Sequence, residues 1–133
     1  MAEGSSAAAL KEAFQMHLRA RRVRSRALSR LPSCGRSNTG KKCAGMEGVI
    51  QEGAEALEEE GDETVLNLGL IGAGSRVEHY EMAGYITASS LAKRMGATEI
   101  VTLLSQSLAE EEMAERKLRN IVSGLLKGAP LEA

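Results

Sequence analysis

The sequence predicts an all-α protein, and three observations support that prediction. Apolar residues recur at helical spacing in four separate segments, and no segment shows the strict alternation of a half-buried strand. Aromatic residues are scarce, with one Phe, two Tyr and no Trp. The core must therefore be built from Ala, Leu, Ile, Val and Met, which suits closely packed helices. A chain of 133 residues fits one domain, and we expect residues 1–133 to form it.

The first two predicted helices are unequal in length. One begins near Ser6, with Leu10, Phe14 and His17 along a single stripe, and is broken by Pro32 and the residues after it. The second is short and covers residues 46–60, with an apolar face opposite an acidic one. Two glycines inside it weaken an isolated helix, so we expect it to dock on a larger element.

The last two predicted helices are long. The third runs from about Glu63 to Met95, and Gly96 is its expected C-terminal stop. The fourth opens with Thr98 as N-cap and Glu99 in the first turn, where a negative charge suits the helix dipole. Glycines at 124 and 128 weaken its end, so we expect residues 123–133 to form a frayed tail.

Charge is distributed unevenly along the chain. Residues 1–42 hold ten basic and two acidic residues, a net charge of +8, whereas residues 43–133 hold seven basic and sixteen acidic residues, a net charge of −9. The basic segment could neutralise several phosphates, which makes sequence-independent nucleic-acid binding one candidate function. The segment from His17 to Cys43 contains no aromatic residue for base stacking, which weakens that candidate.

Several function classes find no support. No apolar run approaches the roughly 20 residues of a membrane span, and no signal peptide is visible, so we expect a cytoplasmic protein. Cys34 and Cys43 form neither a disulfide framework nor a common zinc motif. The run "GLIGAG" follows no strand and is interpreted as small residues for helix contact rather than a nucleotide loop.

Carboxylates occupy positions where core residues belong. Glu78 and Glu81 lie on the inward stripe of the third helix, and Glu111 and Glu115 lie on that of the fourth. Buried carboxylates need a cation, a proton or hydrogen-bond partners, and two such pairs on facing helices suit a hard or borderline metal. The alternative is a solvated charged face. His79 falls off the stripe and is predicted to be a surface residue rather than a ligand.

The segments "GKKCAGMEGVIQEGAEALEEEGD", "RVEHYEMAGY" and "EEEMAERKL", together with "LKEAFQMHL", resemble the YciE/YciF ferritin-like stress-protein family. The resemblance implies a ferritin-like four-helix bundle with a short extra helix in the crossover, a homodimer, and a di-iron carboxylate site that oxidises iron during stress. Mapped here, the metal ligands would be Glu78, Glu81, Glu111 and Glu115, with Glu110 or Glu112 as neighbours that a small rotation could substitute.

Two departures from the family reduce the expected activity. The family's first helix is absent, and the acidic residues that follow "HL" in its second helix are replaced by "RARRV". We interpret the divergent basic residues 19–40 as translated out of frame, because one reverse translation of residues 27–40, read two nucleotides later, encodes the acidic helix "LEQVAELRAEQHG". The coding DNA tests this hypothesis. With an incomplete iron site, the alternative functions are a non-enzymatic helical interaction module, whose open groove a partner covers, or the weak nucleic-acid binder.

Overall fold

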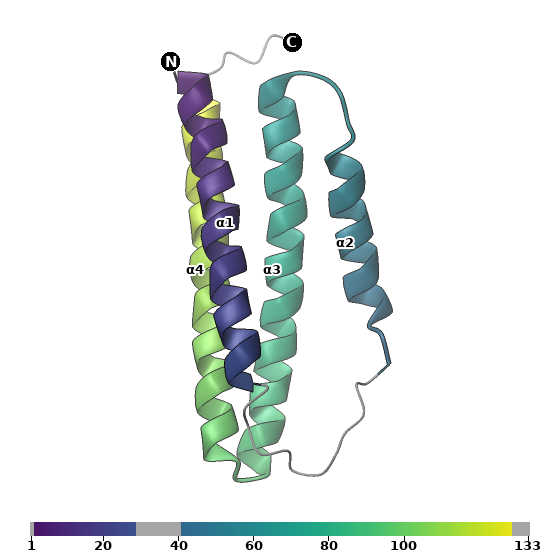
Figure 1. Cartoon of the computed structure of the whole chain (residues 1–133), viewed down its shortest axis with the longest axis vertical. Helices are drawn as coiled ribbons and strands as arrows, with labels where there is room; N and C mark the ends of the chain where they lie inside the picture. Colours follow the sequence, from purple (N-terminus) through teal and green to yellow (C-terminus); the bar gives the residue numbers. More distant parts are fainter. Residues whose placement is uncertain (1, 29–40, 129–133) are drawn as a thin grey trace.

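The computed structural model describes residues 2–28 and 41–128, which form four helices (Figure 1). These are α1 (Ala2–Leu28), α2 (Ala44–Ala56), α3 (Glu63–Arg94) and α4 (Thr98–Gly128). No strand occurs within these ranges, so the all-α prediction is confirmed. None of the helices in the described ranges is both long enough and apolar enough to cross a membrane.

The three long helices lie side by side, and the short one stands apart from their common centre (Figure 1). Helices α3 and α4 form an antiparallel hairpin with the most extensive interface of the molecule. Helix α1 packs mainly on α4 and touches α3 only locally, while α2 packs on α3 alone. The predicted docking of the short helix on a larger element is therefore confirmed.

Local chemistry explains the ends of α3. Asp62 caps its N-terminus, because Oδ1 accepts hydrogen bonds from the N–H groups of Thr64 at 2.9 Å and Val65 at 3.1 Å. Gly96 adopts a φ of 71°, a left-handed conformation that glycine tolerates best, and it follows the last helical turn. The predicted stop at Gly96 is therefore confirmed.

The other helix ends differ in detail from the sequence prediction. Helix α1 begins at Ala2 rather than Ser6, which is consistent with the Ala-rich composition of its start. Helix α2 ends at Ala56, before the predicted Gly61. Thr98 is the first residue of α4 rather than its N-cap. The Val101 N–H donates a hydrogen bond to the Ala97 carbonyl at 3.0 Å, and this bond places Thr98 inside the first turn.

An apolar core joins α1, α3 and α4 towards one end of the bundle. Its buried members are Leu10, Ile71, Leu118 and Leu125, with Leu68, Leu70, Ile121 and Val122 packed around them. Because Leu125 belongs to this core, α4 continues as a helix to Gly128 through part of the segment expected to fray. The rest of that segment, residues 129–133, lies outside the described residues.

One glycine allows the three long helices to approach closely. A Cβ placed on Gly74 would lie 3.0 Å from the Phe14 ring and 3.2 Å from a Leu118 methyl group. Gly74 belongs to the "GLIGAG" run, and its predicted role in helix contact is confirmed. On the far side of α3, Gly45 of α2 lies so close to Tyr80 that a Cβ at this position would clash with the ring.

Candidate metal centre

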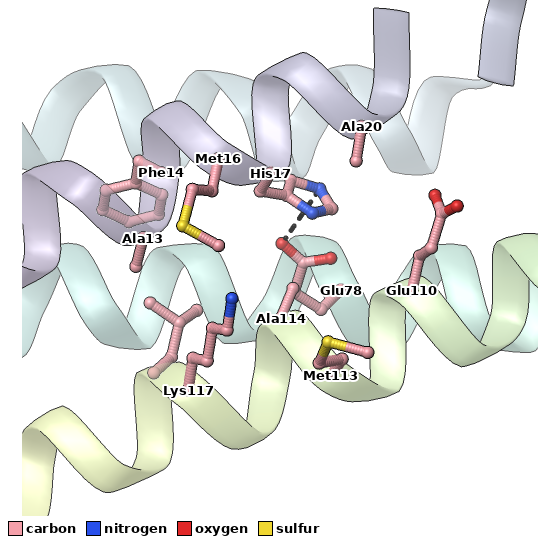
Figure 2. A pocket seen from close by; sticks show the side chains of 11 residues that line it. Ala13, Phe14, Met16, His17, Ala20, Glu78, Glu110, Met113, Ala114 and Lys117 are labelled. Atoms are coloured by element: carbon pink, nitrogen blue, oxygen red, sulfur yellow. Dashed lines mark ion pairs between the residues drawn. The ribbon is translucent and has the colours of Figure 1, made fainter. Parts of the chain in front are cut away.

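Four potential metal ligands from three helices meet near the middle of the bundle. His17 of α1, Glu78 and Glu81 of α3 and Glu111 of α4 each offer one ligand atom, and these four atoms all lie within 4.8 Å of one another. We call these residues the His/Glu cluster. Figure 2 shows the His17 ring turned from α1 towards the Glu78 carboxylate on α3.

His17 stands between the two most buried carboxylates. Its Nε2 atom lies 3.4 Å from Glu78 Oε1 and 3.3 Å from Glu111 Oε2. A protonated imidazole would make an ion pair with both carboxylates. A neutral imidazole offers a ring nitrogen as a metal ligand at the same position. The same geometry therefore suits either a proton on His17 or a metal ion bound by His17, Glu78 and Glu111.

Burial makes this arrangement energetically demanding. Glu78 retains 3% of its possible exposure and Glu111 retains none, while His17 and Glu81 are half-buried. Bringing several carboxylates out of water costs several kcal/mol per ion unless positive charge and hydrogen bonds compensate. The His/Glu cluster itself supplies three carboxylates and one imidazole. A divalent cation fits this donor set, because carboxylate oxygen and imidazole nitrogen suit iron, manganese and zinc.

The sequence positions of the cluster follow from the apolar core. His17, Glu78 and Glu111 each stand seven residues from a core residue on the same helix, namely Leu10, Ile71 and Leu118. Seven residues are close to two helical turns, so each polar group lies on nearly the same face as its apolar counterpart and about 10 Å along the axis. The bundle therefore contains an apolar layer followed by a polar layer.

The structure brings together three of the four predicted ligands. Glu78, Glu81 and Glu111 belong to the His/Glu cluster, whereas Glu115 does not. Glu115 Oε1 accepts hydrogen bonds from Arg119 one turn later on α4, at 2.7 Å from Nη2 and 3.2 Å from Nε. The spacing of Glu115 and Arg119, four residues apart on one helix, is a signal that the sequence already contained.

The sequence prediction missed His17 as a candidate ligand. The helical spacing places His17 on the same stripe as Leu10 and Phe14, but no ligand role is predicted for it. The sequence signal for a ligand role was a titratable side chain, the His17 imidazole, on the same helical stripe as Leu10. His79, predicted to be a surface residue, is exposed, and its Nδ1–H donates to the Ser75 carbonyl at 2.8 Å. Glu112 is exposed, and Glu110 is half-buried beside the cluster.

A second polar contact joins α3 to the start of α2. Tyr80 Oη lies 2.9 Å from Cys43 Sγ, at the N-cap of α2. The hydrogen bond from Tyr80, helped by backbone N–H groups at the helix start, lowers the pKa of the Cys43 thiol below its ordinary value. The same hydrogen bond raises the pKa of Tyr80. This exposed pair lies apart from the His/Glu cluster and belongs to the docking of α2.

Comparison with known proteins bears on this geometry. A family model described as "Domain of unknown function (DUF892)" matches residues 1–129. The chain belongs to the DUF892 family. It is 39% identical to Protein YciF of Escherichia coli strain K12 over 80 residues, which are 60% of this chain and 48% of YciF. The chain thus matches about half the length of that curated relative.

Two solved structures share the fold of this DUF892 chain. The crystal structure of the E. coli stress protein YciF superposes with a TM-score of 0.83 at 27% identity, covering 96% of this chain and 89% of the other. YcfI from Rhodopseudomonas palustris superposes with a TM-score of 0.74 at 29% identity, covering 89% and 83% of the two chains. The resemblance to the YciE/YciF family is therefore confirmed, and a stress-related helical protein is supported.

Part of the basic segment lies within the described structure. Helix α1 continues through it as far as Leu28, and Arg19 and Arg22 are exposed. Residues 29–40, which carry the rest of its divergent sequence, lie outside the described residues. Nucleic-acid binding by this segment and its out-of-frame origin therefore both stay predictions.

Proposed function

We propose that this chain is a ferritin-like, metal-binding stress-response protein whose His/Glu cluster holds one divalent cation, with iron as the physiological metal. The observation that carries the proposal is the convergence of four ligand atoms within 4.8 Å at a buried position shared by three helices. The stress context is supported by the likeness to YciF, a stress protein of E. coli. The localisation we propose is cytoplasmic.

The donor set favours one ion over the two of a di-iron centre. Di-iron carboxylate bundles use four carboxylates and two histidines, contributed by four helices. In the described residues, three helices bring together three carboxylates and one histidine. Iron bound there would supply one-electron redox chemistry. We therefore propose metal binding with weak or no sustained iron oxidation.

The chain's own residues would divide the work of holding the cation. Glu78 and Glu111 supply carboxylates that water reaches least, so their orientation is fixed by the surrounding helices. His17 lies within 3.4 Å of both and would release its proton when the ion binds. Glu81 is less buried and gives the site its third carboxylate. Binding therefore couples the positions of α1, α3 and α4.

Anaerobic equilibrium dialysis against iron(II), followed by metal analysis, tests the proposal. We expect one ion per chain in the wild type and loss of that ion in Glu111→Gln, which keeps the shape of the side chain but removes its charge. Glu115→Gln is the matched control on the same helix and should retain the ion. No bound iron in the wild type, or equal retention by both variants, would contradict the proposal.

We also propose that the chain forms a homodimer. Apolar side chains remain exposed along the second half of α3 and at its C-cap, where Ile86, Leu91 and Met95 are each more than half exposed. Contact with a second copy would remove these side chains from water. Sedimentation velocity over a range of concentrations should show a dimer, and a monomer at every concentration would contradict this proposal.

A further inference from the structure

A cavity of about 140 Å³ lies beside the His/Glu cluster (Figure 2). Its walls come from α1 and α4, with α3 closing one side, and they include Ala13, Phe14, Met16, Met113, Ala114 and Leu118. His17, Glu78 and Glu110 give it a polar edge, and Lys117 adds one ammonium group. Because His17 and Glu78 belong to both features, the cavity opens directly onto the candidate metal site.

The mouth of this cavity gathers exposed apolar side chains. Phe14, Met16 and Met113 retain 37%, 41% and 55% of their possible exposure, although each belongs to a type that folding normally buries. Methionine side chains are flexible and polarisable, so they adapt to the shape of a guest molecule. An apolar opening that leads to a buried polar cluster is the usual form of a small-molecule site.

Volume and charge restrict the guest. An engineered apolar cavity of about 150 Å³ accommodates benzene, so this cavity is large enough for one aromatic ring. Glu78 and Glu110 place carboxylates at the polar edge and Lys117 places an ammonium group there, so the edge carries both signs of charge while most of the wall is apolar. The lining therefore suits an uncharged molecule.

We propose that this cavity binds a small uncharged, mainly apolar molecule with one aromatic ring, with any single polar group directed at His17 and Glu78. At that position the guest would lie against the ligands of the candidate metal. Binding does not depend on the proposed metal site, because the cavity is built from side chains of the metal-free chain.

Methyl NMR on the metal-free protein tests the site. With ¹³C-methyl methionine labelling, saturating phenol should shift the Met16 and Met113 resonances and leave those of Met46 and Met95, on other surfaces, unchanged. Benzylamine and benzoate, the charged counterparts of similar size, should produce weaker shifts. Absence of saturable shifts with phenol would overturn the proposal, and tighter binding of either ion would overturn the assignment of an uncharged guest.

A filled cavity gives the second arm of the experiment. Ala114→Leu adds bulk to the wall and should abolish the phenol-induced shift of Met16. Ala109→Leu, at an exposed position on the same helix, is the matched control and should leave the shift unchanged. Unchanged binding in Ala114→Leu, with circular dichroism showing both variants folded, would overturn the location. Iron dialysis on the same samples separates failure here from failure of metal binding.

Discussion

The same three helices meet twice, in an apolar layer and in a polar layer. Leu10, Ile71 and Leu118 form the apolar layer. Seven residues away on the same helices, His17, Glu78 and Glu111 form the polar layer. The apolar layer and the two carboxylates of the polar layer are buried, but only the apolar layer gains free energy from leaving water. The difference shows that helical spacing decides where a side chain lies, while the chemistry of that side chain decides what the position does.

The largest expected effect comes from breaking the apolar layer. Leu118→Ala removes a buried side chain that packs near Gly74 and Phe14, and should lower the free energy of unfolding by about 2–5 kcal/mol. Urea denaturation measures this value. A loss below about 1 kcal/mol would mean that this layer is not the main source of stability.

Converting the polar layer into a second apolar layer should have the opposite sign. The quadruple variant His17→Leu, Glu78→Leu, Glu81→Leu and Glu111→Leu removes the whole His/Glu cluster, and should raise the free energy of unfolding of the metal-free chain by about 1–4 kcal/mol. It should also lose all iron binding. Destabilisation of this variant would show that the polar layer contributes to stability without a metal.

Smaller effects on stability are expected from alanine substitutions at Gly74 and Gly84, both on α3. Gly84→Ala adds a methyl group where nothing lies within 4 Å, so it should stabilise the helix by about 1 kcal/mol. Gly74→Ala gains the same helix propensity, but its methyl group would press on Phe14 and Leu118 between the two layers. This overpacking should lower the free energy of unfolding by about 1–3 kcal/mol. Thermal unfolding should therefore rank Gly84→Ala above Gly74→Ala, and the reverse order would contradict close packing at Gly74.

The smallest expected effect lies outside both layers. Because Tyr80 lowers the pKa of the Cys43 thiol, alkylation of Cys43 should reach half its maximal rate at a pH below that of an ordinary cysteine. Tyr80→Phe should move this midpoint to higher pH. Iodoacetamide labelling followed over pH in a Cys34→Ser background measures it, and identical midpoints would exclude the Tyr80 hydrogen bond as the cause.

The long helices could be predicted well from sequence because their signals are local. Apolar periodicity predicted α3 and α4, and Gly96 at the end of α3 carried a recognisable stop. The predicted starts of α1 and α4 and the end of α2 were less accurate. These ends depend on competing local hydrogen bonds and on packing, and the sequence pattern does not resolve them.

The candidate site was predicted in part, for a similar reason. Glu78, Glu81 and Glu111 were recognisable as charged residues on apolar stripes, a contradiction visible within one helix. His17 joins them only because α1 packs on α4 at a particular height, and that register is a tertiary property. Glu115 shared the stripe but pairs with Arg119, because a salt bridge within the helix satisfies its carboxylate.

Metal-dependent thermal unfolding tests the central claim, that the polar layer exists to hold a cation, most directly. At a free iron(II) concentration of about 100 times the dissociation constant, binding to the folded chain alone should add about 2.7 kcal/mol to the free energy of unfolding. We expect this gain in the wild type and in Glu115→Gln, and none in Glu111→Gln. An unfolding temperature of the wild type that does not change with iron(II) would contradict the claim.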